Sequence, residues 1–136
     1  SYERLGEFSA PRDIIWSDEE GSQLIRMAPD SDNTCVELRA ADCVCEPHFV
    51  IGLVIYSALD GISEKLELPP KNSGSERLPS TLEEAMNCAE ASLFVKKHIP
   101  ANILEVLLRY RREEWREYTT AYDKEAFEDK KYFYNL

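Results

Sequence analysis

Two charged residues at alternate positions, Glu37 and Arg39, carry the clearest chemistry in the sequence. They lie in the stretch Thr34–Ala40, where apolar residues occupy the intervening positions, and this is the period of a β-strand. Alternation places the carboxylate and the guanidinium on one face of that strand. A carboxylate is a hard oxygen ligand for a divalent cation, and a guanidinium matches the geometry of phosphate and carboxylate groups. Without further context, such a pair is usually an exposed ion pair of small energy.

The cysteines offer a second, weaker possibility for chemistry. Cys43, Cys45 and His48 would have to converge at a strand-to-helix turn to hold a metal ion, and their spacing is not that of a zinc finger or ribbon. The pattern favours reduced cysteines that serve as small buried hydrophobes, with His48 in a structural role. The sequence shows no nucleophile triad, P-loop or dinucleotide-binding motif.

Three short strands are predicted to position the charged pair. Asp13–Trp16 and Gln23–Met27 precede Thr34–Ala40, and polar connections rich in turn-forming residues separate the three segments. Successive short strands with such connections predict an antiparallel meander. The strands together take up residues 1–45.

A helix over residues 46–67 is predicted to form the core. Pro47 suits the first helical position, and the sequence from Phe49 to Leu59 is apolar almost all round. A helix without a polar face is buried on every side, so the sequence predicts a helix covered in part by later helices. We expect five of its side chains to be nearly inaccessible: Phe49, Val50, Leu53, Val54 and Leu59.

Residues 68–79 form a predicted linker, because three prolines and a glycine interrupt them. The helical segment 80–136 follows, opened by a capping box of Ser80 and Glu83. The helix that begins at this capping box is expected to end near His98, and the next helix of the segment is expected to begin at Pro100 or Asn102. The second is predicted to bury Ile103, Val106, Leu107 and Tyr110, before a last helical turn or two within Asp123–Tyr134. The fold class is therefore α+β.

The charge and hydropathy of the sequence limit the classes of partner that the chain is expected to bind. The 136 residues include 26 acidic and 16 basic side chains, giving a formal net charge of −10, which argues against nucleic acid and anionic membranes as partners. The apolar run Phe49–Leu59 is too short to span a bilayer, and no signal peptide is visible at the start. We expect a soluble, cytoplasmic protein.

Several motifs in the same order resemble one family. The chain reads SYERL, SAPRDIIWS, SQLIRMAP, VELRAADCVCEPHFVIGLVIYSALDGI, RLPSTLEEAM and LLRYRREEW. These stretches resemble SYKRL, EAPVYISWS, SALIRVP, IELRxPDxxANPYLxxAxxLxAGLDGI, LPxSLEEAL and xxRRxEW of glutamine synthetase, the ligase of nitrogen metabolism that uses ATP to join ammonia to glutamate. The resemblance covers nearly the whole chain and corresponds to the C-terminal part of that enzyme's catalytic domain.

The resemblance implies roles for three residues. Glu37 matches a metal-binding glutamate, Arg39 matches an arginine that binds glutamate and the transferring phosphoryl group, and Arg26 matches an arginine on the nucleotide side. No residue is assigned a catalytic role. Mg²⁺ or Mn²⁺ and ATP are implied for the full-length enzyme, together with glutamate and ammonia. The implied protein partners are the remainder of the catalytic domain and further copies in a homo-oligomer.

The sequence also departs from the family pattern at several positions near the implied binding sites. The family's RNRS turn is here Glu19-Glu20-Gly21-Ser22, and the arginine two residues before the metal glutamate is Cys35. Asp32 stands where a basic residue is sometimes found, and Glu46 replaces an asparagine. Gly21, Cys35 and Asp32 each stand where the family can have a basic residue, and fewer cations near the phosphates should weaken nucleotide binding. The other metal ligands and the ammonia-site residues of the family lie upstream of anything resembling SYERL. We therefore expect the isolated chain to bind no cofactor and to make no glutamine.

Two alternatives remain open on the sequence alone. The chain could belong to a related γ-glutamyl-amine ligase, because the lost arginines affect the substrate and nucleotide sites. It could also be a non-catalytic module for oligomer assembly, since the family's C-terminal segment packs between subunits. Glu37 and Arg39 favour the enzymatic interpretation, and Gly21 and Cys35 favour the alternatives.

Overall fold

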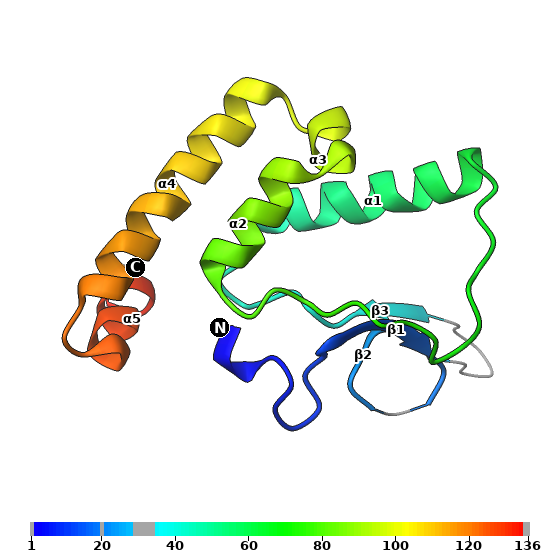
Figure 1. Ribbon diagram of the computed structural model, residues 1–136, viewed down its shortest axis with the longest axis horizontal. Coiled ribbons are helices and arrows are strands. Elements are labelled where there is room, and N and C mark those ends of the chain that lie inside the picture. The colour runs from blue at the N-terminus through cyan, green and yellow to red at the C-terminus, as the bar shows by residue number, and fades with distance from the viewer. Residues whose placement is uncertain (1, 20, 29–34, 135–136) are drawn as a thin grey trace. The chain divides into compact units, whose positions relative to one another are not determined.

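The computed structural model describes residues 2–19, 21–28 and 35–134 (Figure 1). The described residues divide into two compact units, Ser1–Ser80 and Thr81–Leu136, called here the first unit and the second unit. The first contains a three-stranded sheet and a long helix, and the second contains four helices. This confirms the α+β class. Among the helices described, none is long and apolar enough to cross a bilayer. The predictions that involve Glu20, Asp32 and Thr34 fall outside the described residues.

The sheet of the first unit has the order β1-β2-β3, with β1 at Asp13–Ser17, β2 at Gln23–Ala28 and β3 at Cys35–Leu38 (Figure 1). The predicted antiparallel pairing is confirmed for β2 and β3. It is wrong for β1 and β2, which pair in parallel, so the sheet is mixed.

Chain length explains why the connection between β1 and β2 permits a parallel pair. Five connecting residues reach at most about 18 Å, and a strand as short as β1 measures about 13–17 Å. A connection of five residues can therefore run back along the full strand instead of making a tight turn. Polarity and glycine content do not distinguish these two paths, so the sequence pattern favoured the commoner hairpin.

The predicted linker lies along the free edge of β1. The Ile14 backbone N–H donates to the Glu76 carbonyl at 3.0 Å, and the Leu78 N–H donates to the Arg12 carbonyl at 2.9 Å. Asp13 and Arg77 form an isolated antiparallel bridge. Further along, the Trp16 indole Nε1 donates to the Pro69 carbonyl at 2.8 Å. The segment has no strand of its own, yet these bonds fix its path past β1.

Helix α1 spans Pro47–Ser63, with the proline at its first turn as predicted. It ends earlier than the predicted 67. The prediction of burial on every side is wrong, because none of its residues is buried. Leu59 is 53% exposed and Ile62 is 76% exposed. An all-round apolar sequence indicates what a helix is able to bury, but it does not identify a partner, and the three short strands offer little apolar surface.

The second unit contains α2 at Leu82–Ala91, α3 at Leu93–His98, α4 at Ala101–Thr120 and α5 at Lys124–Tyr132. Figure 1 shows α2 and α4 joined through the short α3, with α5 folded back at the far end of α4. The buried apolar side chains of this unit are Met86, Ile99, Leu104 and Leu108. They form the core that α2 and α4 share.

Local capping corrects two predictions for this unit. The N-cap of α2 is Thr81, not Ser80, and its hydroxyl accepts from the Glu84 N–H at 3.1 Å. The single helix predicted to run to His98 is broken at Ser92, whose hydroxyl accepts from the Val95 N–H at 3.2 Å and starts α3. A serine inside an apolar helical pattern competes for backbone hydrogen bonds, and here it begins a new helix.

The buried stripe of α4 also differs from the prediction. Ile103, Val106 and Tyr110 are exposed, whereas Leu104 and Leu108 are buried. Both choices satisfy a spacing of three or four residues, so periodicity alone did not select the correct face. The buried face continues to Glu114, a charged residue that the apolar pattern could not include.

Candidate functional site

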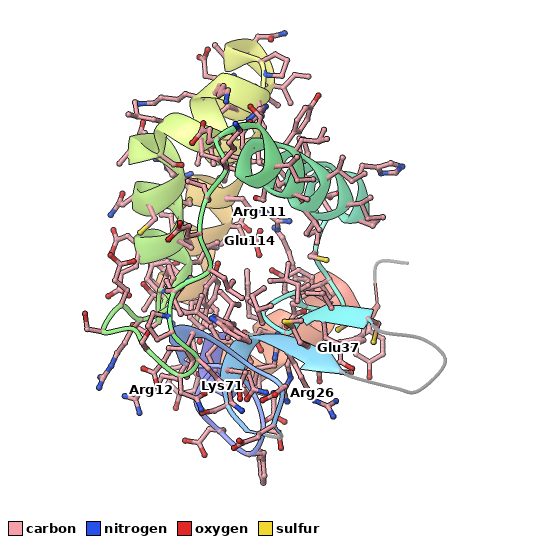
Figure 2. The ribbon with its side chains drawn as sticks, turned by 90° about the vertical axis from the view of Figure 1, so that its right-hand side faces the viewer. Arg12, Arg26, Glu37, Lys71, Arg111 and Glu114 are labelled. Carbon is pink, nitrogen blue, oxygen red and sulfur yellow. The ribbon has the colours of Figure 1, made fainter. Side chains whose placement is uncertain are left out.

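Arg26 and Glu37 face each other across the β2–β3 pair. The antiparallel register places the two residues directly opposite, one on each strand. The Arg26 Nη1 lies 3.4 Å from both carboxylate oxygens of Glu37. Figure 2 shows the two side chains on neighbouring strands, and both keep access to solvent, with the Arg26 side chain 26% and the Glu37 side chain 42% exposed. At 3.4 Å the contact is longer than the usual 2.9 Å hydrogen bond, so it is a loose ion pair.

Arg39 follows directly after β3 and has different partners. Its backbone N–H donates to the Leu24 carbonyl at 2.9 Å, which continues the ladder with β2. Its guanidinium donates to the Ser9 carbonyl at 2.7 Å and to the Gly21 carbonyl. The observed strand β3 thus lies within the predicted Thr34–Ala40 but ends at Leu38, before Arg39. Of the three residues singled out from the sequence, the sheet pairs Arg26 with Glu37, and Arg39 binds two loop carbonyls.

The loop after β1 carries its own charged cluster. Lys71, from the predicted linker, forms ion pairs with Asp18 and with Glu19, the second at 3.0 Å. The hydrogen bond that Lys71 donates lowers the pKa of Asp18, and the hydrogen bonds that Lys71 donates to Asp18 and Glu19 raise the pKa of Lys71. The Lys71 ammonium thus binds the loop at the position where glutamine synthetases, which the sequence resembles, have the arginine-containing turn RNRS. Sequence reasoning missed Lys71, because more than fifty positions separate it from the loop.

Arg4 fixes the chain just beyond Arg39. Its Nη2 donates to the carbonyls of Ala40 at 2.8 Å and Ala41 at 3.0 Å, and its Nε lies 3.5 Å from the Asp42 carboxylate. Partial burial opposes ionisation of Asp42. The N–H of Val44, the Cys43 thiol and Arg4 outweigh it, so the pKa of Asp42 is lowered. No short motif signals this contact, since Arg4 lies at the other end of the first unit.

A metal ion in a protein needs several donor side chains close together. In that part of the chain, no three His, Cys, Asp or Glu side chains cluster closely enough to hold a metal ion. The alternative set of Cys43, Cys45 and His48 is therefore not assembled. Glu37 fits the chemistry of Mg²⁺ or Mn²⁺ as a single, solvent-accessible carboxylate ligand. A complete coordination sphere needs further oxygen ligands.

Comparison with known proteins assigns the class. Residues 1–130 match the family model described as "Glutamine synthetase, catalytic domain". The chain therefore belongs to the glutamine synthetase catalytic-domain family.

Curated relatives agree with this assignment. A glutamine synthetase of Methanosarcina mazei is 34% identical over 134 residues, which cover 87% of this chain and 30% of the relative. One from Methanocaldococcus jannaschii is 29% identical over 89% of this chain, and one from Staphylococcus aureus is 31% identical over 88%. The chain spans about 30% of the length of the curated relatives it matches.

Proposed function

We propose that this chain is the C-terminal part of an ATP-dependent glutamate–ammonia ligase. Glu37 contributes one ligand to a divalent cation, Arg39 binds the substrate, and Arg26 binds the nucleotide phosphates. The family match over residues 1–130 supports the class of reaction. The observation that carries the residue roles is the cross-strand register, which brings the Arg26 guanidinium to 3.4 Å from the Glu37 carboxylate.

The chemistry of phosphoryl transfer needs these two kinds of group close together. A divalent cation, when bound, neutralises phosphate oxygens and polarises the phosphoryl group. Glu37 offers the anionic oxygen that such a cation prefers, and Arg26 offers a cation of fixed planar geometry for phosphate oxygens. The two side chains come from neighbouring strands, so the backbone ladder sets the distance between their Cα atoms and keeps the two groups together.

Arg39 suits a positioning role for an anionic substrate. The hydrogen bonds to the carbonyls of Ser9 and Gly21 hold its guanidinium in place before any ligand arrives. A group that is already ordered loses less conformational entropy when it binds, which favours affinity. Both carbonyls belong to loops of the first unit, so the path of these loops determines where the guanidinium lies.

The isolated chain is expected to be inactive. In this proposal it supplies a minority of the groups that the reaction needs, because a single carboxylate does not complete a metal site. The departures at Gly21 and Cys35 leave two related proposals in place. The acceptor could be an amine other than ammonia, and the chain could serve oligomer assembly without catalysis.

A chimera tests the proposal and separates these alternatives. Residues 1–136 would replace the matching C-terminal segment of the Methanosarcina mazei glutamine synthetase, and glutamine formation and oligomer size would be measured. We expect an assembled, active chimera whose activity is lost in Glu37→Ala and Arg39→Ala and retained in the exposed control Glu67→Ala. A chimera that assembles normally but makes no product with ammonia or small amines would support the assembly role. Full activity in Glu37→Ala would refute the assigned metal role.

A further inference from the structure

The four cysteines of the chain are free thiols that solvent can reach. Cys35, Cys43 and Cys88 are exposed, and Cys45 is partly exposed. The prediction that the cysteines serve as small buried hydrophobes is therefore wrong. Within the residues that the structure describes, they join no cluster able to hold a metal ion. Accessible thiols are open to oxidation, and Cys43 and Cys45 are the two that lie closest together in the sequence.

Cys43 and Cys45 lie on one tight turn just before α1. The Cys45 backbone N–H donates to the Asp42 carbonyl at 3.1 Å, and the Val44 N–H donates to the Asp42 Oδ1 at 3.0 Å. Two residues of extended chain span at most about 7 Å, and a turn brings them closer. A disulfide joins residues whose Cα atoms are about 4.4–6.8 Å apart. The turn therefore keeps the two cysteines within the span of a disulfide.

We propose that Cys43 and Cys45 form a reversible redox site that exchanges with small disulfides of the glutathione type. The Cys43 thiolate attacks one sulfur of oxidised glutathione, forms a mixed disulfide and releases one glutathione thiolate. The Cys45 thiolate then attacks the Cys43 sulfur, the bond to glutathione breaks, and the second glutathione thiolate leaves. Two protein thiols are thereby oxidised to one disulfide, and one oxidised glutathione is reduced to two thiols. The protons lost by the two cysteines are taken up by the two glutathione thiolates.

The exposure of the pair predicts a labile disulfide. Exposed disulfides have higher reduction potentials than the structural disulfides of secreted proteins, so they are reduced more readily. Redox-sensing cysteines are accessible and often lie beside a resolving cysteine, which is the role of Cys45 here. The oxidised form should therefore return to two thiols in excess reduced glutathione. This redox site does not depend on the roles proposed for Glu37, Arg39 and Arg26.

Hydrogen bonds connect the cysteine turn to a distant part of the first unit. The Cys43 thiol donates to the Asp42 Oδ1 over 3.6 Å, and oxidation removes this donor. The Asp42 carboxylate also lies 3.5 Å from the Arg4 Nε, and the Arg4 Nη2 donates to the carbonyls of Ala40 and Ala41. Oxidation should therefore change the surroundings of Asp42 and, through Arg4, of the segment that leads away from β3.

Thiol exchange on the folded chain tests the redox site. Replacing the two other exposed cysteines, as Cys35→Ser with Cys88→Ser, leaves a two-thiol chain that contains only Cys43 and Cys45. This two-thiol chain would be incubated with oxidised glutathione, quenched in acid, and analysed by intact mass and by free-thiol count. We expect the loss of both thiols, with no glutathione retained and no dimer formed. Excess reduced glutathione should restore both thiols.

Single variants of the two-thiol chain identify the two roles. Cys45→Ser removes the resolving thiol, so it should retain one glutathione on Cys43. Cys43→Ser should react more slowly, because Cys45 is the less exposed of the two. A two-thiol chain that keeps a glutathione on each cysteine, forms mainly disulfide-linked dimers, or does not react would overturn the redox site.

NMR of the ¹⁵N-labelled two-thiol chain tests the connection to Arg4. Oxidation should shift the Arg4 Nε–H signal and the backbone amides of Ala40 and Ala41, and it should leave the amides of Met86 and Leu108 in the second unit unchanged. In Arg4→Gln, the shifts at Ala40 and Ala41 should fall by at least half. Shifts confined to residues 43–45 would overturn the connection but leave the redox site in place, and so would shifts at Ala40 and Ala41 that persist in full in Arg4→Gln.

Discussion

The two units of the chain are stabilised in different ways. The second unit has an apolar core shared by α2 and α4, with Met86, Leu104 and Leu108 buried. The first unit is held largely by directional polar contacts, in which Arg4 and Arg39 donate to backbone carbonyls of distant loops. Its long helix α1 contains no buried residue. The unit with the candidate site thus fixes charged groups by hydrogen bonds, and the other unit gains its stability from hydrophobic burial.

Each unit contains one of the two tryptophans, so the comparison can be measured. Trp16 lies in β1 and donates to the Pro69 carbonyl, and Trp115 lies in α4 with its ring 5.7 Å from that of Tyr118. Fluorescence of a Trp16→Phe background reports unfolding of the second unit. A Trp115→Phe background reports unfolding of the first. Both backgrounds are needed, because a chain of two units need not unfold in a single step.

The largest expected effect is that of Leu108→Ala in the second unit. Leu108 is 6% exposed at the centre of the buried stripe of α4, and truncating a buried leucine leaves a cavity. We expect the free energy of unfolding of the second unit to fall by about 2–5 kcal/mol. Urea denaturation followed by Trp115 fluorescence measures it. The control Val106→Ala changes an exposed residue of the same helix and should cost under about 1 kcal/mol. Equal losses for both would mean that the buried face of α4 is misassigned.

A smaller loss is expected for Glu114→Gln. The Glu114 carboxylate is buried, 4% exposed, and accepts from the Arg111 Nη1 at 2.6 Å (Figure 2). The amide keeps the shape of the side chain but removes its charge and leaves a partly buried guanidinium without its counter-ion. We expect a loss of about 1–3 kcal/mol in the same urea assay. Glu113→Gln is the matched control, since its ion pair with Arg116 is exposed and should contribute under about 1 kcal/mol. If the two variants lose equal stability, burial does not strengthen the Glu114 pair.

The sequence predicted those elements that local patterns encode. The alternation around Glu37 identified β3, and Pro47 marked the first turn of α1. The predictions from the sequence were wrong where two different structures satisfy the same pattern. Ser80 and Thr81 are adjacent and both able to cap, and the observed cap depends on which hydroxyl reaches the Glu84 N–H. The direction of β1 relative to β2 depends on the path of a five-residue loop, which composition does not specify.

The candidate site was likewise predictable from the sequence only in part. The family motif and the strand period selected Glu37, Arg39 and Arg26 from the sequence. The pairing of Arg26 with Glu37 depends on the register of two strands, and a shift of one residue would have put Arg26 on the opposite face. Lys71 and Arg4 act over long sequence separations, and no spacing rule links them to the loops they bind.

A smaller, pH-dependent effect is expected from Asp42 in the first unit. Its native pKa lies below the ordinary value of 3.8, because the Val44 N–H, the Cys43 thiol and Arg4 outweigh the effect of burial. A lowered native pKa stabilises the fold above the unfolded pKa, and this contribution is lost as the pH falls through the native pKa, below about pH 4. Asp42→Asn should therefore destabilise the first unit at pH 7, and the difference should vanish in acid. Urea denaturation followed by Trp16 fluorescence across this range measures it, and a pH-independent difference would contradict the assignment.

The smallest effect is expected for Leu59→Ala in α1, the same substitution as in Leu108→Ala. Leu59 is 53% exposed, so most of its side chain already contacts solvent in the folded chain, and its removal leaves no cavity. We expect a change of less than about 0.5 kcal/mol in the unfolding of the first unit, against about 2–5 kcal/mol for the buried leucine. Leu53→Ala, for which the sequence alone predicts the full cost of a buried leucine, should lie between these limits, because Leu53 is half-buried. The measurement belongs at low micromolar concentration, where contact between exposed apolar faces of different molecules is minimised. A loss of about 2 kcal/mol or more for Leu59→Ala, the lower bound for a buried leucine, would show that α1 is covered in solution and that hydrophobic burial stabilises both units.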